Sequence, residues 1–172
     1  MTAEGAPSET DPLAGIRRSV WQIPRNFLDL SHVVIGRGKF GSVIKGKVNN
    51  RGAEDAAIVQ VVPGKIMDER EMREMAREVD AVARCDDHPN VLGLIGVCEE
   101  RDALFVVLRE GDTTLKQTLL DSRALTHFPA YAQKNQRVTT LQEETVADAM
   151  VGVARGMRRL EELGVSVDIS LS

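Results

Sequence analysis

The residues best suited to chemistry lie in the run from Ile35 to Val43, which reads I-G-R-G-K-F-G-S-V. Gly36, Gly38 and Gly41 are spaced as G-x-G-x-x-G, and such glycines let backbone amides approach phosphate oxygens because no Cβ intervenes. The run lies between two segments of β type, so it predicts a phosphate-binding turn that joins one strand to the next. A plain hairpin turn would explain the same glycines without any ligand.

Histidine and cysteine show no comparable pattern. His32, His88 and His127 are scattered along the chain, and no serine or cysteine is arranged with them as a nucleophile. Cys85 and Cys98 form no C-x-x-C pair and have no histidine at zinc-ligand spacing. We therefore expect ordinary histidines and two buried, reduced thiols.

The bulk composition is that of one globular domain. The chain has 172 residues, is 42% hydrophobic and carries a formal net charge of -4. Acidic and basic residues are interspersed, so we expect no nucleic-acid partner. No apolar run approaches the ~20 residues that cross a bilayer, and the N-terminus has no hydrophobic leader. These features predict a cytoplasmic protein without a membrane span.

The middle of the chain alternates between β-type and helical patterns. Three β-type runs, 28–36, 41–48 and 55–62, are bounded by Gly, Asn, Asp or Pro. A helix follows over about 67–85, because Met72, Met75, Val79 and Val82 recur at helical spacing. The segments 91–98 and 103–108 then predict a second hairpin.

The two ends are less regular. Residues 1–19 are small and polar, and we expect a flexible leader there. A short helix is predicted over 114–120 and a long loop over 121–140. A last helix is expected to begin near Thr140 and Glu143 and to end at Gly164. Its apolar stripe would face water or a partner, and it consists of Val146, Met150, Val153, Met157 and Leu160.

Four segments in a fixed order resemble the catalytic domain of receptor tyrosine kinases. Besides the glycine run, these are W-Q-I-P-R at 21–25, H-P-N-V-L-G-L-I-G-V-C at 88–98 and V-A-R-G-M-R-R-L at 153–160. The resemblance implies an α+β fold: a kinase N-lobe with a five-stranded antiparallel sheet and an αC helix, then αD and αE helices of an incomplete C-lobe. The implied division is a leader (1–19), a juxtamembrane-like segment (20–27), N-lobe and hinge (28–111), a partial C-lobe (112–164) and a non-family tail (165–172).

The resemblance also assigns roles to residues of the site. Glu78 matches the αC glutamate, whose lysine partner on the third strand holds the α and β phosphates. That lysine is missing, because its place falls on Gln60 or on Val59. The Val59 register puts Ala57 over the adenine, whereas the Gln60 register puts the bulkier Ile58 there. The remaining implied nucleotide residues are Ile35, Gly36, Gly38, Gly41, Val43, the gatekeeper Leu108 and the hinge residue Glu110.

A substitute for the missing lysine is conceivable in Lys39, Lys45 or Lys65, although exposed solubilising lysines explain all three. The family's H-R-D and D-F-G motifs do not follow the last helix, and Asp168 matches the family aspartate only by chance. We therefore expect no catalytic and no metal-binding residues, weak ATP binding at most, and no magnesium site.

These features lead to two main hypotheses about function. The first is a catalytically inactive, pseudokinase-like interaction module that binds a protein partner through the stripe of the last helix. The second is an incomplete chain of an active ATP-dependent protein-tyrosine kinase. A third, an unrelated α/β interaction module with a glycine turn, would show a different strand order.

Overall fold

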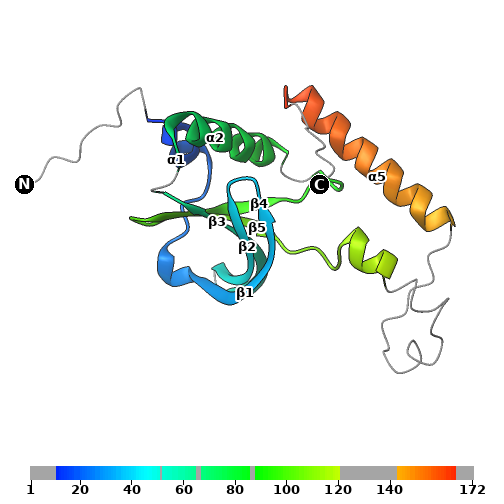
Figure 1. Cartoon of the computed structure of the whole chain (residues 1–172), viewed down its shortest axis with the longest axis horizontal. Helices are drawn as coiled ribbons and strands as arrows, with labels where there is room; N and C mark the ends of the chain where they lie inside the picture. Colours follow the sequence, from blue (N-terminus) through cyan, green and yellow to red (C-terminus); the bar gives the residue numbers. More distant parts are fainter. Residues whose placement is uncertain (1–10, 51, 65–66, 86–87, 121–142, 166–172) are drawn as a thin grey trace, which may run out of the picture.

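The computed structural model describes residues 11–50, 52–64, 67–85, 88–120 and 143–165 (Figure 1). Its centre is a five-stranded sheet of order β1-β2-β3-β5-β4, in which every neighbouring pair is antiparallel. This order confirms the predicted α+β fold. The elements are α1 (Ala14–Ser19), η1 (Arg25–Phe27), β1 (Leu28–Gly38), β2 (Gly41–Asn50), β3 (Ala53–Pro63), α2 (Glu69–Arg84), β4 (Leu94–Glu99), β5 (Ala103–Arg109) and α5 (Glu143–Glu162).

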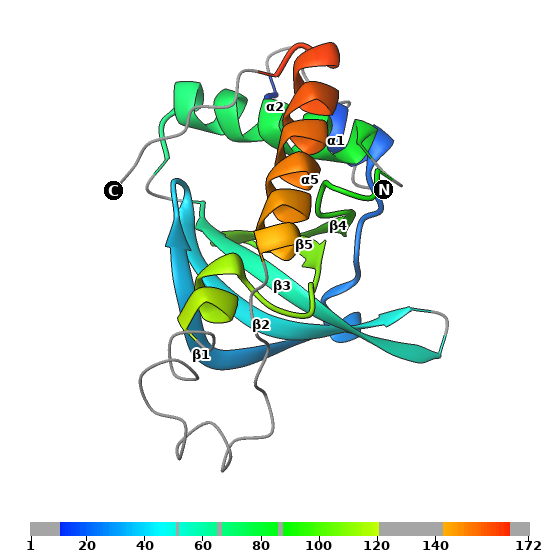
Figure 2. The ribbon, with the colours of Figure 1, turned by 90° about the vertical axis from the view of Figure 1, so that its right-hand side faces the viewer.

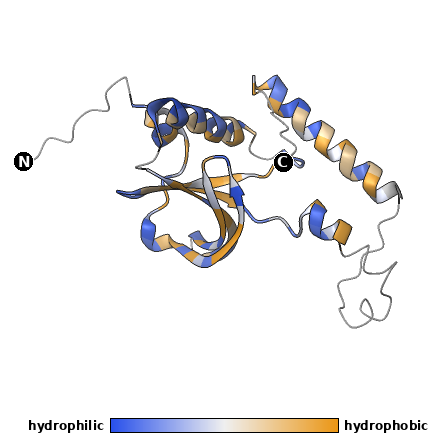
Figure 3. Cartoon of the chain, viewed as in Figure 1, coloured by the Kyte–Doolittle hydropathy of each residue, from blue (hydrophilic) through white to orange (hydrophobic). Residues whose placement is uncertain are grey.

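The sheet has two apolar faces because successive side chains of a strand point to opposite sides. On the first, here called the α2 face, Met75 and Val79 of α2 pack against strand residues that include Val62 and Val106. The other, here called the outer face, buries Leu28, Ile44, Val48, Ala57, Val59, Cys98, Phe105 and Val107. Figure 3 shows the hydrophobic sheet beneath α2. The side of α2 that faces away from the sheet is hydrophilic.

Helix α2 begins at a capping box that the sequence contains in full. The side chain of Asp68 accepts a hydrogen bond from the Glu71 backbone N–H at 2.8 Å, and Glu71 Oε2 accepts one from the Asp68 backbone N–H at 3.1 Å. This exchange satisfies two amides that have no partner within the helix. It fixes the start of the helix, and with it the direction in which Glu74 and Glu78 project.

The predicted flexible leader is wrong for residues 11–19. They include α1, which lies beside α2 (Figure 1) and buries Leu13 and Ile16 in the α2-face cluster. Two apolar residues three apart are enough to give a short helix one buried side. Residues 1–10 lie outside the described part of the chain.

The C-terminal part contains the expected long helix. Figure 2 views the molecule from the side on which α5 lies. At Gly156 the helix lies close to the segment before β4. A Cβ there would lie only 2.5 Å from the Asn90 carbonyl oxygen, so this close approach needs a glycine. Val146, Met150 and Val153 of the stripe are exposed, whereas Met157 and Leu160 are half-buried.

Helix α5 ends close to Gly164, as predicted, and this glycine adopts a positive φ of 78°. Residues 115–120 are helical as well. Thr140, the long loop over 121–140 and the tail from 166 onwards lie outside the described residues, so those predictions remain predictions. Within the described part of the chain, no helix is both long and apolar enough to cross a membrane.

Candidate functional site

The glycine run forms a tight hairpin between β1 and β2. Gly38 pairs with Gly41 and Arg37 with Ser42, so the run joins strand to strand as predicted. Its tip, Lys39 and Phe40, turns toward α2: the Phe40 ring is buried in the α2-face cluster. The hairpin therefore lies next to α2, over the face of the sheet on which α2 packs.

The three glycines meet different surroundings. A Cβ on Gly41 would lie 1.9 Å from the Val61 carbonyl oxygen, and one on Gly38 would lie 2.9 Å from Nε2 of Gln60. A Cβ on Gly36 would meet nothing within 4 Å. The packing of the chain on itself thus explains Gly41, while Gly36 has open space beside it in which a ligand could approach.

We expect Gly41→Ala to destabilise the protein by about 1–3 kcal/mol, because its methyl group would overlap a backbone atom that cannot swing aside. Gly36→Ala should change the free energy of unfolding by less than about 0.5 kcal/mol, as at an ordinary surface position. Urea unfolding of the two variants measures both effects. Equal losses in both would contradict the glycine environments described above.

The register of β3 decides whether Gln60 or Val59 lies on the α2 face. Gln60 pairs with Val43 on one side and with Val106 on the other, and Val106 belongs to the α2-face cluster. Val59 pairs with Val107 and is fully buried on the outer face. Residues paired directly across strands share a face of the sheet, so Gln60 is the residue on the α2 face, beneath the hairpin.

Ala57, which is expected over the adenine in the Val59 register, does not share the α2 face with Gln60. Ala57 is fully buried on the outer face, in the same cluster as Val59. Ile58 is on the α2 face instead, paired with Lys45 on β2 and with Leu108 on β5. A shift of one residue exchanges all the side chains between the faces, and the apolar run of β3 allowed both registers.

An ion pair joins β2 to the residue that follows β5 and lies beside Ile58 of β3. Nζ of Lys45 lies 2.5 Å from Oε1 of Glu110, which follows β5. The Lys45 side chain is nevertheless exposed, as a solubilising lysine would be, and Glu110 is paired with a residue of β2. Leu108, the expected gatekeeper, is half-buried beside Ile58.

Lys39 forms the other ion pair near the hairpin. Its Nζ lies 2.7 Å from Oε1 of Glu74 on α2 and over the Phe40 ring, 5.1 Å from the ring centroid. The contact draws the hairpin tip toward α2, and the Lys39 ammonium lowers the pKa of Glu74. Lys65, the third lysine considered, lies outside the described residues.

Glu78 lies one helical turn after Glu74, so both carboxylates are on the hairpin side of α2. Partial desolvation raises the pKa of Glu78; the Lys39 ammonium lowers it and the neighbouring Glu74 carboxylate raises it. The net direction is upward although the side chain retains access to solvent. Glu78 therefore lies on the hairpin side of α2, and its pKa is raised above the usual value.

We expect Glu78→Gln to stabilise the protein at pH 7 and to have little effect near pH 3.5. Because the folded-state pKa is raised, folding opposes ionisation, and this penalty grows as pH rises from the unfolded pKa of about 4.3 through the raised value. Urea unfolding at the two pH values tests the sign. A loss of stability at pH 7 would instead mean that the carboxylate makes a favourable contact.

The other predicted residues are placed as follows. Val43 is half-buried and lies beside Gln60, whereas Ile35 is 45% exposed next to an irregularity of β1 between Val34 and Gly36. A separate hollow of about 610 Å³ opens at the other end of β3, and Glu110 is the only predicted site residue along it. The described residues contain no group of three or more acidic, histidine or cysteine side chains that could hold a metal ion.

Sequence reasoning missed the two ion pairs and the burial of Phe40. Lys45 and Glu110 are 65 residues apart, and Lys39 and Glu74 are 35 apart, so no local pattern connects either pair.

The two cysteines are buried and unpaired, as predicted, and burial raises the pKa of the Cys98 thiol. Its proximity to Glu100 acts in the same direction, and Arg25 acts against both.

Known proteins share this arrangement of segments. The chain is 30% identical over 131 residues to the angiopoietin-1 receptor of Danio rerio, and 29% identical over 148 residues to the tyrosine kinase receptor Cad96Ca of Drosophila melanogaster. It is 26% identical over 145 residues to the Drosophila protein Wsck, which is described provisionally as an inactive tyrosine-protein kinase. These matches cover 75%, 84% and 84% of this chain but only 12%, 19% and 17% of the three relatives.

A family model agrees with these relatives. The model for protein tyrosine and serine/threonine kinases matches residues 30–165, which is most of the chain. The match runs from the first strand, through the glycine hairpin, α2 and the remaining strands, to the end of α5. With the strand order and the glycine hairpin in place, the chain belongs to the protein tyrosine and serine/threonine kinase family, and it is of the tyrosine-kinase type.

Proposed function

We propose that this kinase-type domain acts by binding and not by phosphoryl transfer. The observation that supports the proposal is the position of Gln60 on the α2 face, beneath the glycine hairpin, because Gln60 is one of the two residues at which the resemblance to the family expects a lysine. A neutral amide cannot supply the fixed positive charge that holds the nucleotide phosphates. Transfer of a phosphoryl group depends almost wholly on positioning and charge neutralisation, so losing this charge removes a principal source of acceleration.

Two described lysines near the hairpin, Lys39 and Lys45, are each paired with a glutamate. Lys39 is engaged by Glu74, at 2.7 Å, and Lys45 by Glu110, at 2.5 Å. Ile58 further narrows the adenine position. We infer that ATP binds weakly at most and that magnesium does not strengthen its binding.

A protein partner is the other part of this proposal. Val146, Met150 and Val153 leave the apolar stripe of α5 exposed, with Met150 69% accessible. Contiguous apolar surface of this kind marks sites of protein contact. We infer a protein and not a nucleic acid as its partner, and a cytoplasmic location for the domain. Self-association of the chain through this side of α5 is the simplest alternative to binding of a different protein. Sedimentation velocity of the natural chain and of Met150→Glu would detect it.

Titration of the purified chain with ATP, followed by calorimetry with and without magnesium, tests the nucleotide part. We expect weak binding or none, the same in both buffers. Gly36→Val is the matched control, because a Cβ at this position would meet nothing within 4 Å and the side chain would add bulk beside the hairpin. Tight binding that requires magnesium and is lost in Gly36→Val would refute the proposal.

The similarity to relatives named as tyrosine kinases supports a second candidate, an active ATP-dependent protein-tyrosine kinase of which this chain is a part. Incubation with radiolabelled ATP and a tyrosine-containing peptide separates the two. Incorporation of phosphate above that of a denatured sample would favour the second candidate. We expect none.

A further inference from the structure

The hollow of about 610 Å³ lies at the end of β3 that is away from the glycine hairpin. Its apolar lining is formed by Ala56, Leu94 and Ile95, and Trp21 lines it as well. Asp55 contributes a carboxylate from the outer face, because it pairs with a residue of the outer-face cluster. A hollow of this size that combines apolar side chains with a few polar ones has the character of a ligand site.

The position of Trp21 in the wall of the hollow is fixed by backbone pairing with β4. The Val97 N–H donates to the Trp21 carbonyl at 2.9 Å, and the Ile23 N–H donates to the Val97 carbonyl at 2.7 Å. A Cβ on Gly96 would lie 2.5 Å from the Trp21 carbonyl oxygen, so this approach needs a glycine. Trp21 nevertheless remains 39% exposed. One wall of the hollow is therefore held in place and is still accessible to a ligand.

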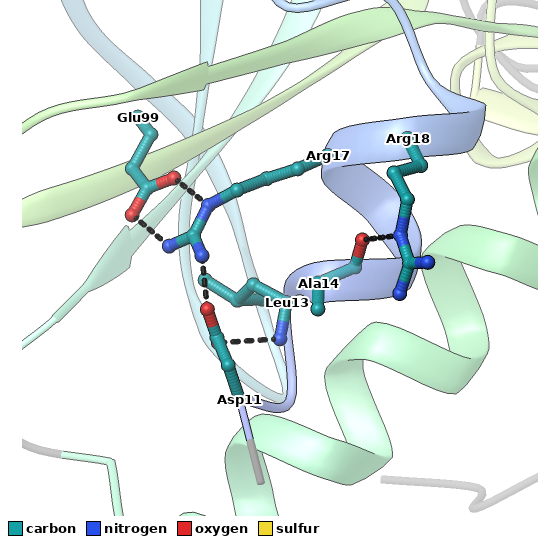
Figure 4. Close-up of polar contacts among 6 residues, drawn as sticks. All are labelled: Asp11, Leu13, Ala14, Arg17, Arg18 and Glu99. Carbon is teal, nitrogen blue, oxygen red and sulfur yellow. Dashed lines mark hydrogen bonds and ion pairs between the residues drawn. The ribbon is translucent and has the colours of Figure 1, made fainter. Parts of the chain in front are cut away.

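The helix before Trp21 is fastened to the same strand by a planar ion pair. Nε of Arg17 donates to Oε2 of Glu99 at 2.8 Å, and Nη2 donates to Oε1 at 2.6 Å, so two parallel hydrogen bonds join the guanidinium to the carboxylate (Figure 4). Nη1 of Arg17 contacts the carboxylate of Asp11 in the same view. Bidentate pairs of this kind are directional, and they are how carboxylates hold guanidinium groups most strongly.

Three polar side chains along the hollow have no partner within the described part of the chain. The Asp55 carboxylate, the Asn50 amide and the indole N–H of Trp21 form no hydrogen bond or ion pair with any other described residue. Glu110 differs from them because it is engaged by its ion pair with β2, and Arg109 has an interaction of its own. The groups that remain to receive a ligand are one carboxylate, one amide and one indole.

A guanidinium group matches these three side chains better than other charged groups do. It is planar, so it stacks on an indole face, and its five N–H donors suit a carboxylate together with an amide oxygen. A lysine ammonium has no flat face to stack. An anion such as a phosphate would be repelled by the carboxylates of Asp55 and Glu110.

We propose that this hollow binds an arginine side chain of a partner protein. The guanidinium stacks on Trp21, forms two parallel hydrogen bonds with the Asp55 carboxylate and donates a further one to the Asn50 amide oxygen. The apolar side chains of the hollow contact the arginine stem. No residue of the glycine hairpin or of α5 lies along the hollow, so this site is independent of the function proposed above.

Fluorescence titration of the full chain tests the site, because Trp21 is its only tryptophan. The probe is a tripeptide with blocked ends and arginine between two glycines, and matched peptides carry lysine or the uncharged isostere citrulline instead. We expect the arginine peptide to bind at least about tenfold more tightly than the citrulline peptide, because hydrogen bonds between charged groups are the stronger ones. The lysine peptide should bind more weakly than the arginine peptide, since it cannot stack.

Two matched variants locate the binding. Asp55→Asn should lower the affinity for the arginine peptide at least about tenfold. Asp29→Asn makes the same change at an exposed position outside the hollow and should leave the affinity as it is. Asp55 is exposed too, so both variants should fold, and urea unfolding checks that they do. Gly36→Val should bind the peptide as the natural chain does.

Four results would overturn the proposal. Unchanged Trp21 fluorescence at millimolar arginine peptide would mean that the hollow does not take this group. Equal affinity for the arginine peptide and either of the other two would mean that it does not select a planar cation. Full affinity in Asp55→Asn would remove the carboxylate from the site. Loss of affinity in Gly36→Val would place the peptide at the glycine hairpin instead.

Discussion

Val59→Lys should unfold much of the protein, whereas Gln60→Lys, one residue further along the same strand, should leave it folded. Val59 is fully buried in the outer-face cluster, where a lysine would have no acidic partner. An uncompensated buried charge costs about 3–5 kcal/mol. That is a large part of the ~5–15 kcal/mol by which a domain of this kind is stable.

Gln60 is the matched control because it lies on the α2 face, partly accessible to solvent, beneath Gly38 and on the side of Glu78. A lysine at position 60 could reach solvent and would lie on the same side as the acidic residues of α2. We expect a change of at most about 1 kcal/mol in the free energy of unfolding, measured in urea for both variants. Tolerance of Val59→Lys together with unfolding of Gln60→Lys would mean that the strand has the other register.

The Ile58→Ala/Gln60→Lys double variant should bind ATP at least about tenfold more tightly than the natural chain. The first change enlarges the adenine position next to Leu108, and the second restores a cation beneath the hairpin. A hydrogen bond to a charged group contributes about 1.5–3 kcal/mol, and 1.4 kcal/mol corresponds to a tenfold change in affinity. Isothermal titration of both proteins measures the gain.

Two further variants locate the gain within the site. Adding Gly36→Val to the double variant should remove the improvement, since it fills the space beside the hairpin. Adding Lys45→Ala should lower the affinity, because it removes a cation and leaves the Glu110 carboxylate without this partner near an anionic ligand. A folded double variant with the affinity of the natural chain would show that residues 58 and 60 do not face the nucleotide position.

Much of the fold was accessible from local sequence. The spacing of Met72, Met75, Val79 and Val82 predicted α2, and the burial of Met75 and Val79 confirms the face that it implied. The β-type segments on both sides of the glycine run predicted a hairpin where the structure has one. In both cases the pattern lies in residues that are close together in the sequence.

The register of β3 was not accessible in the same way. Its residues from Ala56 to Val62 are apolar at every position except Gln60, so alternation of polar and apolar residues cannot tell one face from the other. Only the pairing with β2 and β5 assigns Gln60 to the α2 face and Ala57 to the outer face. Contacts between distant segments settle this choice.

Helix α1 was missed for a related reason. The small and polar residues around it dominate the average composition of the first 19 residues, whereas docking needs only Leu13, Ile16 and Arg17 at the right spacing. The partners of these three residues lie on α2 and β4, more than 50 residues away in the sequence. A local reading therefore described the segment as a leader.

The most direct measurement is a nuclear Overhauser spectrum of the labelled protein that identifies the neighbours of Gly38. We predict cross-peaks between the α-protons of Gly38 and the side-chain amide of Gln60, since the structure leaves room there for little more than a hydrogen atom. Cross-peaks from Gly38 to the methyl groups of Val59, with none to Gln60, would contradict the account of this site.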